Sequence, residues 1–411
     1  MRRRVVIAGG GFAGVRAAVD LAADDRFAVT LVSQYSHFRY LPALYKTAKG
    51  GRRTGASLRL TDIFAGTGVD LVQATVTGLD RPGRALETTA GPLGYDHLVL
   101  ALGSVLDYTA APAMRDRSYP VKTNDEIAAF KHHLHERIVS DRADLRITIV
   151  GGGSIGVEMA GALPAYLRRI AANHGLPEPA ARLTVVEPGP RLMRSRPPGL
   201  SRAVTRRLRD LGVTLRVGEP IERVDGPTVV WAAAVVNPPF FADNGFPLTA
   251  RGKTAVSPFL EAEPDVYVIG DNADTHLSGL AQTALHHGAY VAADLRRRAA
   301  GSPRVPYRPL RPLLPTTLIP IGPGWVAVQW GRLTVSGRPG AALRWLADRL
   351  TFRDVESWPK AGERWVEAGE DAPDCAACRS QRCRVTQHSG GGGWRRSGRW
   401  PRRRSGSGWP R

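Results

Sequence analysis

The stretch Arg146–Glu158, RITIVGGGSIGVE, places a short apolar segment directly before a glycine-rich turn. The apolar segment predicts a buried strand, and Gly151, Gly153 and Gly156 follow it with the spacing G-x-G-x-x-G before a helical pattern begins. In such a unit the first glycine makes a tight turn and the second lets the backbone approach a pyrophosphate. The third lets helix and strand pack closely, with the anion at the helix N-terminus. The stretch therefore predicts a dinucleotide-binding βαβ unit.

The same arrangement occurs near the start of the chain, at Arg4–Val15, RVVIAGGGFAGV, with Gly9, Gly11 and Gly14. One copy alone is weak evidence, because an ordinary βαβ unit also uses glycines in its turn. Two copies about 140 residues apart, each after a strand and each opening a helix, favour two dinucleotide sites over two structural turns. The flanking residues expected in these sites are Phe12 and Ala13 in the first and Ser154 and Ile155 in the second.

The strands that follow the two loops end differently. The predicted strand Leu183–Val186 runs into Glu187, which would accept hydrogen bonds from ribose hydroxyls and repel a 2′-phosphate, so the second site favours NAD over NADP. The plain alternative for Glu187 is a solvent-exposed acid after a strand. The predicted strand Ala28–Val32 runs instead into Ser33, where an acid commonly sits, so the first site lacks a charge-assisted ribose contact.

Length and hydropathy bound the class of protein. The 411 residues suffice for two or three domains, and no run of about eighteen apolar residues predicts a transmembrane helix. The apolar segment near the N-terminus ends in the first glycine loop, so we expect no signal peptide and a cytoplasmic location. Later segments predict a buried strand at Thr228–Val236, a helix at Ala281–Arg298 and an amphipathic helix at Ala341–Leu350.

The net charge of +20 invites a nucleic-acid interpretation, but its distribution opposes one. Ten arginines and no acid lie in Cys375–Arg411, so half of the excess belongs to the last 37 residues. All three cysteines (Cys375, Cys378 and Cys383) lie there too, which leaves the rest of the chain without a thiol for disulfide chemistry. We expect no nucleic-acid partner, no metal site and a disordered tail.

Taken in order, the motifs GGGFAG, HLVLALGS, IVGGGSIGVEMAGAL, VVEPGPRL, VYVIGDNA and AQTALHHG resemble the two-dinucleotide-binding FAD/NAD-linked oxidoreductases over roughly residues 4–300. Within that family, PALYKTAKG and AQTALHHG resemble type II NADH dehydrogenases, the single-subunit NADH:quinone oxidoreductases. The resemblance implies an α/β fold with two Rossmann-like domains of the glutathione-reductase type. The expected domains are the FAD-binding domain at 1–112 and 256–301, an inserted NADH-binding domain at 113–255, a C-terminal module at 302–368 and the tail at 369–411.

The resemblance also implies roles for single residues. The FAD-binding residues would be Gly9, Gly11, Phe12, Ala13, Gly14, Ser33, Pro42 beside the isoalloxazine, Val76 at the adenine, Ala101, Gly103, Gly270, Asp271 and Ala281. The NADH-binding residues would be Gly151, Gly153, Ser154, Ile155, Gly156 and Glu187. Glu158 would lie near the nicotinamide, and Ala281 and Gln282 would begin the segment that lines a quinone pocket. The implied partners are NADH and a quinone or other acceptor, with peripheral association at the inner face of the cell membrane and a homodimer.

Departures from the family pattern leave alternatives open. His286 and His287 stand where the family usually has glutamine or glutamate, and the stretch between Glu222 and Trp231 is short enough to have lost a family hairpin. Imidazole titrates near neutrality, so His286 is a candidate proton donor to a quinone, with surface exposure or simple packing as the alternative. Two other functions fit the same motifs: a soluble NADH-dependent flavin reductase with oxygen, a dye or an iron–sulfur protein as acceptor, and a non-catalytic redox-responsive interaction protein.

Overall fold

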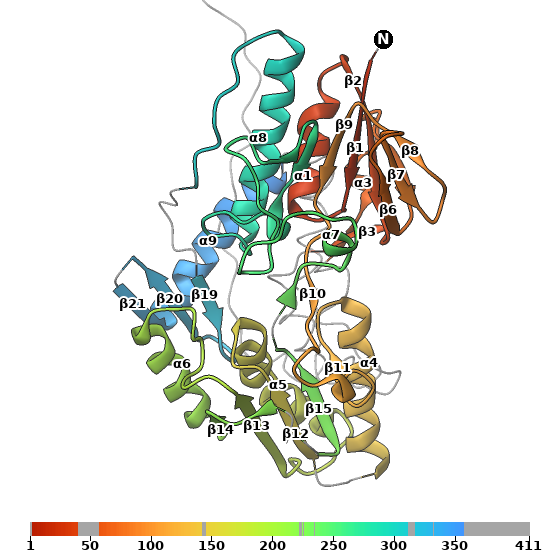
Figure 1. The fold of residues 1–411 in the computed structure, drawn as a ribbon. Coiled ribbons are helices and arrows are strands. Elements are labelled where there is room, and N and C mark those ends of the chain that lie inside the picture. Colours follow the sequence, from red (N-terminus) through yellow and green to blue (C-terminus); the bar gives the residue numbers. More distant parts are fainter. Residues whose placement is uncertain are drawn as a thin grey trace, which may run out of the picture.

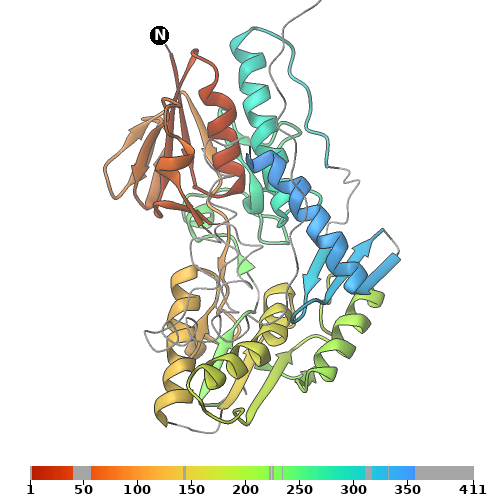
Figure 2. The same ribbon diagram turned by 180° about the vertical axis from the view of Figure 1, so that it is seen from behind.

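The computed structural model describes residues 2–39, 57–141, 145–221, 224, 226–233, 235–310, 317–331 and 333–356. Over these residues the chain forms two α/β lobes joined by a narrow crossing, with a small antiparallel sheet and a long helix beside the lower lobe (Figures 1 and 2). The predicted fold class is confirmed. Pro42 and the tail lie outside the described residues.

The first lobe is built on a six-stranded sheet that is parallel except for its edge strand β17. In spatial order its strands are β17 (Glu261–Glu263), β18 (Val266–Val268), β9 (His97–Leu100), β1 (Arg3–Ala8), β2 (Phe27–Ser33) and β5 (Asp70–Gln73). Helices α1 (Phe12–Ala22) and α8 (Ala281–Ala299) pack together on one face (Figure 1). A three-stranded sheet contributes to the core on the other face, with strands β6 (Val76–Asp80), β7 (Ala85–Thr88) and β8 (Leu93–Gly94).

The second lobe repeats this design with a five-stranded, wholly parallel sheet. In spatial order its strands are β11 (Tyr119–Pro120), β15 (Thr228–Trp231), β12 (Leu145–Val150), β13 (Ala181–Glu187) and β14 (Thr214–Val217). Its main helices are α4 (Asn124–Glu136), α5 (Ser154–Asn173) and α6 (Pro198–Asp210), and a π-helical turn, Arg137–Asp141, extends α4. The apolar sides of the strands and these helices form one buried core, because the strands of a covered parallel sheet bury both faces.

Two strands cross between the lobes, and they differ from the sequence prediction. The predicted buried strand Thr228–Val236 ends at Trp231, and Val235–Val236 forms a separate exposed strand, β16, paired antiparallel with β10 (Val105–Leu106). The chain therefore returns to the first lobe earlier than the expected boundary at 255. Phe240, Phe241 and Phe246 pack in the first lobe's core, because three aromatic rings bury more apolar surface there than an exposed linker could.

The C-terminal module lies against the second lobe. Its antiparallel sheet consists of β19 (Thr317–Pro320), β20 (Val326–Trp330) and β21 (Leu333–Gly337), and α9 (Arg338–Glu356) packs on it. Ile319, Ile321 and Ala327 belong to the second lobe's core. The predicted amphipathic helix at Ala341–Leu350 is thus the middle of a longer helix. The remaining short elements are β3 (His37–Arg39), β4 (Ser57–Arg59), α3 (Leu60–Ile63), α7 (Phe240–Asp243) and the 3-10 turns η3 (Pro112–Met114) and η6 (Gly270–Asn272).

Candidate active site

The two glycine loops have nearly the same backbone. Gly9 and Gly151 adopt φ of +121° and +109°, values that side-chain-bearing residues rarely adopt, and a methyl group on either would run into a carbonyl oxygen of a neighbouring strand end. Gly14 and Gly156 allow helix and strand to touch, since a Cβ there would strike the carbonyl oxygen of the first glycine of the same loop. Each loop thus needs glycine for the reasons that its spacing implied.

The middle glycine of each loop, Gly11 or Gly153, has open space beside it instead of backbone. A Cβ on Gly11 or Gly153 would meet no atom within 4 Å, and each of these residues is the N-cap of its helix, α1 or α5. In neither helix does the N-cap side chain accept from the first amide groups, because the N-cap residue is glycine. A helix N-terminus with free amides and no side chain in front of it suits a phosphate group.

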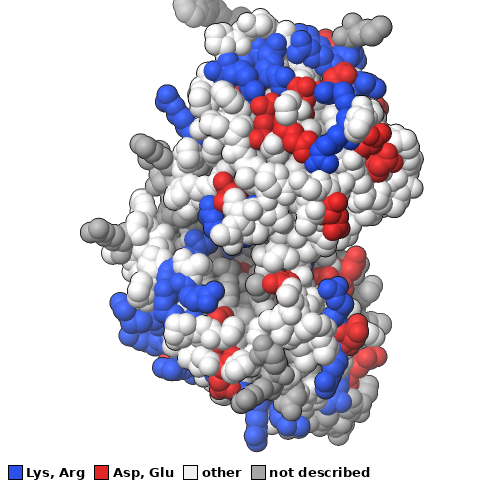
Figure 3. All heavy atoms as spheres, viewed as in Figure 1, with Lys and Arg blue, Asp and Glu red and all other residues white. Residues whose placement is uncertain are grey.

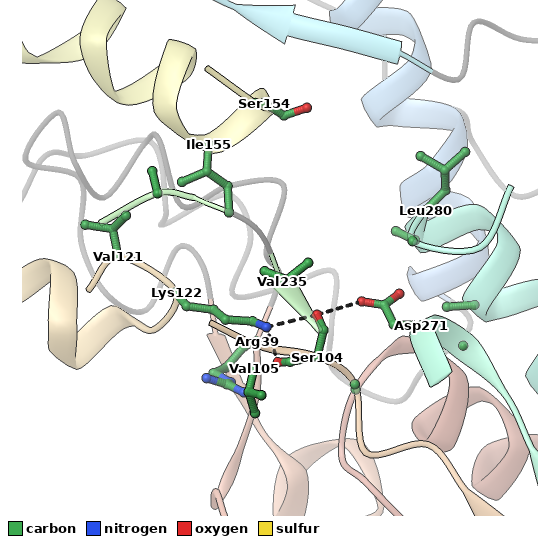
Figure 4. Close-up of a pocket in the computed structure, with 18 of the residues that line it drawn as sticks. Arg39, Ser104, Val105, Val121, Lys122, Ser154, Ile155, Val235, Asp271 and Leu280 are labelled. Atoms are coloured by element: carbon green, nitrogen blue, oxygen red, sulfur yellow. Dashed lines mark hydrogen bonds between the residues drawn. The ribbon is translucent and has the colours of Figure 1, made fainter. Parts of the chain in front are cut away.

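Both loops open onto one cavity of about 1030 Å³. Figure 4 shows the part of it where residues of both lobes meet, with Ser154 and Ile155 on one side and Asp271 and Leu280 on the other. Gly14 and Gly156 do not line the cavity, because they lie beneath their loops. The predicted residues that line it are Gly9, Gly11, Phe12, Ala13, Ser33, Val76, Ala101, Gly103, Gly151, Gly153, Ser154, Ile155, Glu158, Glu187, Gly270, Asp271, Ala281 and Gln282.

The strand ends next to the two loops carry different polar groups. Glu187 accepts hydrogen bonds from the amide of Gly152 (2.7 Å, Oε2) and from that of Gly189 (2.8 Å, Oε1), which fixes its carboxylate beside the second loop. Ser33 donates its hydroxyl to the carbonyl oxygen of Tyr35 (2.8 Å) and accepts from the amide of the same residue (3.2 Å). The second site therefore presents a charged acceptor to a ribose, whereas the first presents a hydroxyl already engaged in a local turn.

Asp271 lies at the edge of the cavity, held there by its own hydrogen bonds and by those of its neighbour Asn272. The side chain of the next residue, Asn272, accepts from the amide of Gly103 (2.9 Å) and donates to its carbonyl oxygen (2.6 Å). The carbonyl oxygen of Asp271 accepts from Lys253 (2.6 Å), and its carboxylate accepts from the hydroxyl of Ser104 (3.2 Å). These contacts join the ends of β9 and β18, so the predicted positions Gly103 and Asp271 lie side by side.

Glu158 is the acid that the cavity perturbs most. It lies on α5, two residues after the third glycine, and burial of its carboxyl group raises its pKa to about 8, against a weaker opposing effect of the Arg344 guanidinium. Arg344 reaches the same wall of the cavity from α9, where its Nη1 donates to the carbonyl oxygen of Leu318 (3.0 Å). A carboxyl group with this pKa is mostly protonated at neutral pH and can donate a proton.

The position of His286 does not support the proton-donor role expected for it. Its Nε2 lies 3.0 Å from the carbonyl oxygen of Arg308, and the residue does not line the cavity, because only the first turn of α8 reaches it. His287 is fully buried, and its Nδ1 accepts from the amide of Gly270 (3.0 Å). Burial lowers the pKa of His287 to about 3, so that ring stays neutral and packs behind the turn that presents Asp271.

Among the cations of the cavity wall that sequence reasoning missed are Arg39, Lys122 and Arg344. Arg39 stacks on the ring of Tyr35 with its guanidinium carbon 3.8 Å from the ring centroid. Lys122 follows β11 and contacts Ser104 across the crossing between the lobes. Each comes from a segment without a recognisable motif. The one available signal was Thr123–Glu126, a capping box that fixes where Lys122 precedes a helix.

The residues present fit two dinucleotides on structural grounds. Each loop leaves a cradle that a Cβ on its middle glycine would fill, each cradle lies at a helix N-terminus, and the end of the neighbouring strand carries a polar acceptor. The first loop, with Ser33 and Asp271, is the expected FAD site, and the second loop, with Glu187, is the expected NADH site. Within the described residues no group of three His, Cys, Asp or Glu side chains could hold a metal ion.

Comparison with known proteins places these features in a family. Residues 3–288 match the family model for pyridine nucleotide-disulphide oxidoreductases. A type II NADH:quinone oxidoreductase of Staphylococcus haemolyticus is 24% identical over 332 residues, which cover 72% of this chain and 82% of that protein. The corresponding protein of Staphylococcus aureus strain NCTC 8325 has the same identity and coverage.

Solved structures confirm the fold. The structure of NDH2 from Plasmodium falciparum in complex with NADH has a TM-score of 0.76 at 13% identity and covers 90% of this chain and 97% of that one. The sulfide:quinone oxidoreductase of Aquifex aeolicus has a TM-score of 0.70 at 15% identity, with 87% and 92% covered. Because the family model spans both glycine loops, Asp271 and the start of α8, this chain belongs to the pyridine nucleotide-disulphide oxidoreductase family.

Proposed function

We propose that this protein is an FAD-dependent NADH dehydrogenase that passes electrons from NADH to a quinone. The observation that carries the proposal is the single cavity onto which both glycine loops open. Hydride transfer needs the donor and acceptor rings in contact, and two dinucleotides held by facing loops in one cavity can meet that need. The curated relatives named type II NADH:quinone oxidoreductases support the same reaction.

The protein's part in this reaction is binding and orientation. A bound flavin would supply the hydride-accepting and electron-releasing chemistry. The two helix N-termini would bind the pyrophosphates, and Glu187 would accept from the ribose hydroxyls of NADH and disfavour a 2′-phosphate. The chain has no cysteine before residue 375, so none of the described residues could pass electrons to the acceptor through a disulfide. Within this part of the chain, the acceptor would meet the bound redox group directly.

The wall between α5, α8 and the C-terminal module supplies an acceptor compartment. Leu280, Leu318, Ile319 and Ala347 give it apolar sides, and Glu158 is its proton-bearing group. Reduction of a quinone takes two electrons and two protons, of which the hydride of NADH brings one proton. Protonated Glu158 can deliver the second, which replaces the role first expected of His286.

An anaerobic two-step mixing experiment tests the proposal. The purified protein, loaded with FAD, is mixed with NADH, and the bleaching of flavin absorbance is followed before a soluble quinone is added. We expect bleaching in the first step and return of the absorbance in the second. No bleaching would contradict any NADH dehydrogenase and favour a non-catalytic role. Bleaching with reoxidation by oxygen or an iron–sulfur protein, but not by quinone, would favour the soluble flavin reductase.

We also propose peripheral membrane association through the C-terminal module. Trp330, Leu333, Trp345 and Leu346 are exposed by 45% to 61% on β20, β21 and α9. Arg202, Arg206 and Arg209 are exposed on the adjoining helix α6, and Figure 3 shows Lys and Arg gathered on this side of the lower lobe. Apolar side chains flanked by arginines suit the surface of an anionic membrane. Within the described residues no helix is long and apolar enough to cross a bilayer.

Vesicle co-sedimentation tests this association. We expect binding to vesicles containing phosphatidylglycerol, weaker binding to neutral vesicles, and loss of binding in Leu333→Ser with Trp345→Ser. Leu248→Ser is the matched control, because Leu248 is exposed to a similar degree (43%) on the other lobe. Equal binding of the double variant would contradict the assignment of the surface. Sedimentation without vesicles tests the homodimer, which also remains a proposal.

A further inference from the structure

The cavity contains a cation, Lys122, that neither glycine loop accounts for. Lys122 lies between β11 and α4, where the chain enters the second lobe, and its own amide donates to the carboxylate of Glu126 (2.7 Å). The same carboxylate accepts from the amide of Thr123 (2.8 Å), and Thr123 caps α4. The backbone of Lys122 is thus fixed by a helix cap, while its side chain extends toward the first lobe (Figure 4).

The ammonium group of Lys122 joins the two lobes through Ser104. It donates to the hydroxyl oxygen of Ser104 (2.9 Å) and to the carbonyl oxygen of the same residue. The hydroxyl of Ser104 in turn donates to the carboxylate of Asp271 (3.2 Å). Figure 4 shows this chain of contacts, with Ser154 and Ile155 of the second loop facing it across the cavity.

Lys122 therefore faces the part of the cavity where the two redox rings have to meet. The adenosine end of the first dinucleotide belongs at Ser33, beside the first loop, so its other end must extend toward Asp271 and the crossing. The second dinucleotide must extend from its own loop toward the same place, since hydride transfer requires contact between the rings. Lys122 and Arg39 both line the cavity, and Figure 4 shows them beside Ser104, below Ile155 of α5.

The surroundings of Lys122 make its charge costly. Burial lowers its pKa to about 8, the nearby Arg39 lowers it further, and the carboxylates of Asp271 and Glu126 act in the opposite direction. The ammonium still carries its proton at neutral pH, and burial weakens its solvation by water. Any negative charge that arrives in the cavity would be attracted to it strongly, because the local dielectric is low.

We propose that Lys122 stabilises the reduced form of the bound flavin relative to its oxidised form. The hydride of NADH carries two electrons and one proton, so the acceptor ring gains one negative charge unless a second proton follows. The ammonium of Lys122, anchored by Ser104 and Asp271, would compensate that charge. The inference rests on the proposed function only for the presence of a flavin in the first site.

A redox titration of the FAD-loaded protein tests the proposal without NADH or quinone. The midpoint potential is measured against reference dyes with a chemical reductant for the wild type, Lys122→Met, Lys122→Gln and Lys122→Arg. We expect the first two variants to favour oxidised flavin at least about tenfold more than the wild type, a shift of about 30 mV to lower potential for a two-electron couple. Lys122→Arg should recover most of the shift.

Lys253→Met is the matched control, because Lys253 donates to the carbonyl oxygen of Asp271 but does not line the cavity. Its potential should move less than that of Lys122→Met. Potentials of Lys122→Met and Lys122→Gln equal to the wild-type value would overturn the proposal. So would loss of flavin from both, since Lys122 would then stabilise both redox states alike. If the midpoint potential of the flavin depends on Lys122 but NADH does not bleach the flavin absorbance, the proposed function would be overturned and the role of Lys122 would stand.

Discussion

The two glycine loops share one backbone and differ in the side chains around it. Gly152 of the second loop donates its amide to Glu187 at the end of the neighbouring strand. The equivalent strand end next to Gly10 is Ser33, whose hydroxyl serves a turn at Tyr35 instead. Under the proposed function, we expect the glycines to fix where a pyrophosphate can lie and the strand end to decide how firmly and how selectively a ribose is held.

The helices that leave the loops differ at the corresponding position too. Two residues after the third glycine, α1 carries Arg16, which pairs with Asp20 at 2.8 Å. At the same position α5 carries Glu158, which faces the cavity and has a raised pKa. A duplicated βαβ scaffold therefore supplies a proton-bearing group on one side only. Under the proposed function, we expect the first loop to retain FAD as a cofactor and the second to exchange NADH as a substrate beside the acidic group.

The largest effect should come from filling one cradle at a time. Gly11→Val and Gly153→Val place a side chain in the open space before α1 or α5, at backbone angles that valine tolerates. We expect Gly11→Val to lose flavin altogether. Gly153→Val should keep stoichiometric flavin, read from its absorbance, but no longer be bleached by NADH.

Thermal unfolding separates blocked binding from damaged structure in this pair. A valine N-cap costs about 1 kcal/mol of stability, so both variants should stay folded. Gly14→Val and Gly156→Val are the contrasting variants, because their side chains would strike backbone and should unfold the protein. If Gly153→Val lost flavin while Gly11→Val kept it, the assignment of the two sites would be reversed.

The second effect concerns Glu158, which has no acidic counterpart in the first unit. We expect Glu158→Gln to slow reoxidation by quinone about 100-fold, the usual contribution of a positioned proton donor, and to leave bleaching by NADH nearly unchanged. Stopped-flow measurement of the two half-reactions checks this. In the wild type the quinone step should slow as pH rises through about 8, where Glu158 loses its proton, and the variant should lack that decline.

Stability offers an independent check on Glu158. Its pKa is raised from 4.5 in the unfolded chain to about 8, so the folded protein binds more protons between these values. The free energy of unfolding should therefore fall as pH rises from 4.5 to 8, and less so in Glu158→Gln. Parallel pH profiles for the two proteins would contradict a buried, protonated carboxyl group at this position.

How much the sequence predicted depended on whether the signal was local. The glycine loops, Glu187 and Asp271 line the cavity as the sequence predicted, because a glycine turn and the polar residues beside it are encoded within a few positions; their contacts with phosphate and ribose stay predictions. The division of Thr228–Val236 into two strands was not predicted, because Val235 and Val236 are as apolar as the residues of a core strand. In the structure they pair with β10 in the crossing between the lobes, where both are exposed. Hydrophobicity alone does not distinguish a buried strand from an exposed crossing strand.

Residues that reach the site from distant elements were the main omission. Lys122 and Arg344 lie 222 positions apart, and neither has a periodic or motif signal that indicates a cavity. His286 shows the opposite error: its position in a family-like segment suggested chemistry, but α8 turns it toward Arg308. A side chain's chemistry can be read from sequence, whereas the direction in which a helix presents it depends on packing across the whole lobe.

A smaller effect is expected when Glu187, at the strand end of the second site, is replaced by serine, the residue at the corresponding strand end of the first site. Glu187→Ser removes the carboxylate that accepts from Gly152 and faces the cavity. Hydrogen bonds to a charged group contribute about 1.5–3 kcal/mol, so the Kd of NADH should rise roughly 10- to 100-fold. The Kd of NADPH should rise less, because repulsion of its 2′-phosphate is lost as well. Quenching titrations with both nucleotides measure the ratio, and a proportional loss for both would show that Glu187 does not select between them.

The reverse exchange, Ser33→Asp, should have the smallest effect. An aspartate at this strand end could accept from a ribose hydroxyl as Glu187 does, but Ser33 is only 7% exposed, so burying a carboxylate there offsets much of the gain. We expect flavin affinity to tighten by no more than about fivefold, or about 1 kcal/mol, measured by titrating the apoprotein with FAD. Ser33→Asn, which keeps a polar group without charge, is the control. Weaker binding in Ser33→Asp alone would mean that the turn from Ser33 to Tyr35 is itself required, because a new charge would then disrupt the site more than a new hydrogen bond could stabilise it.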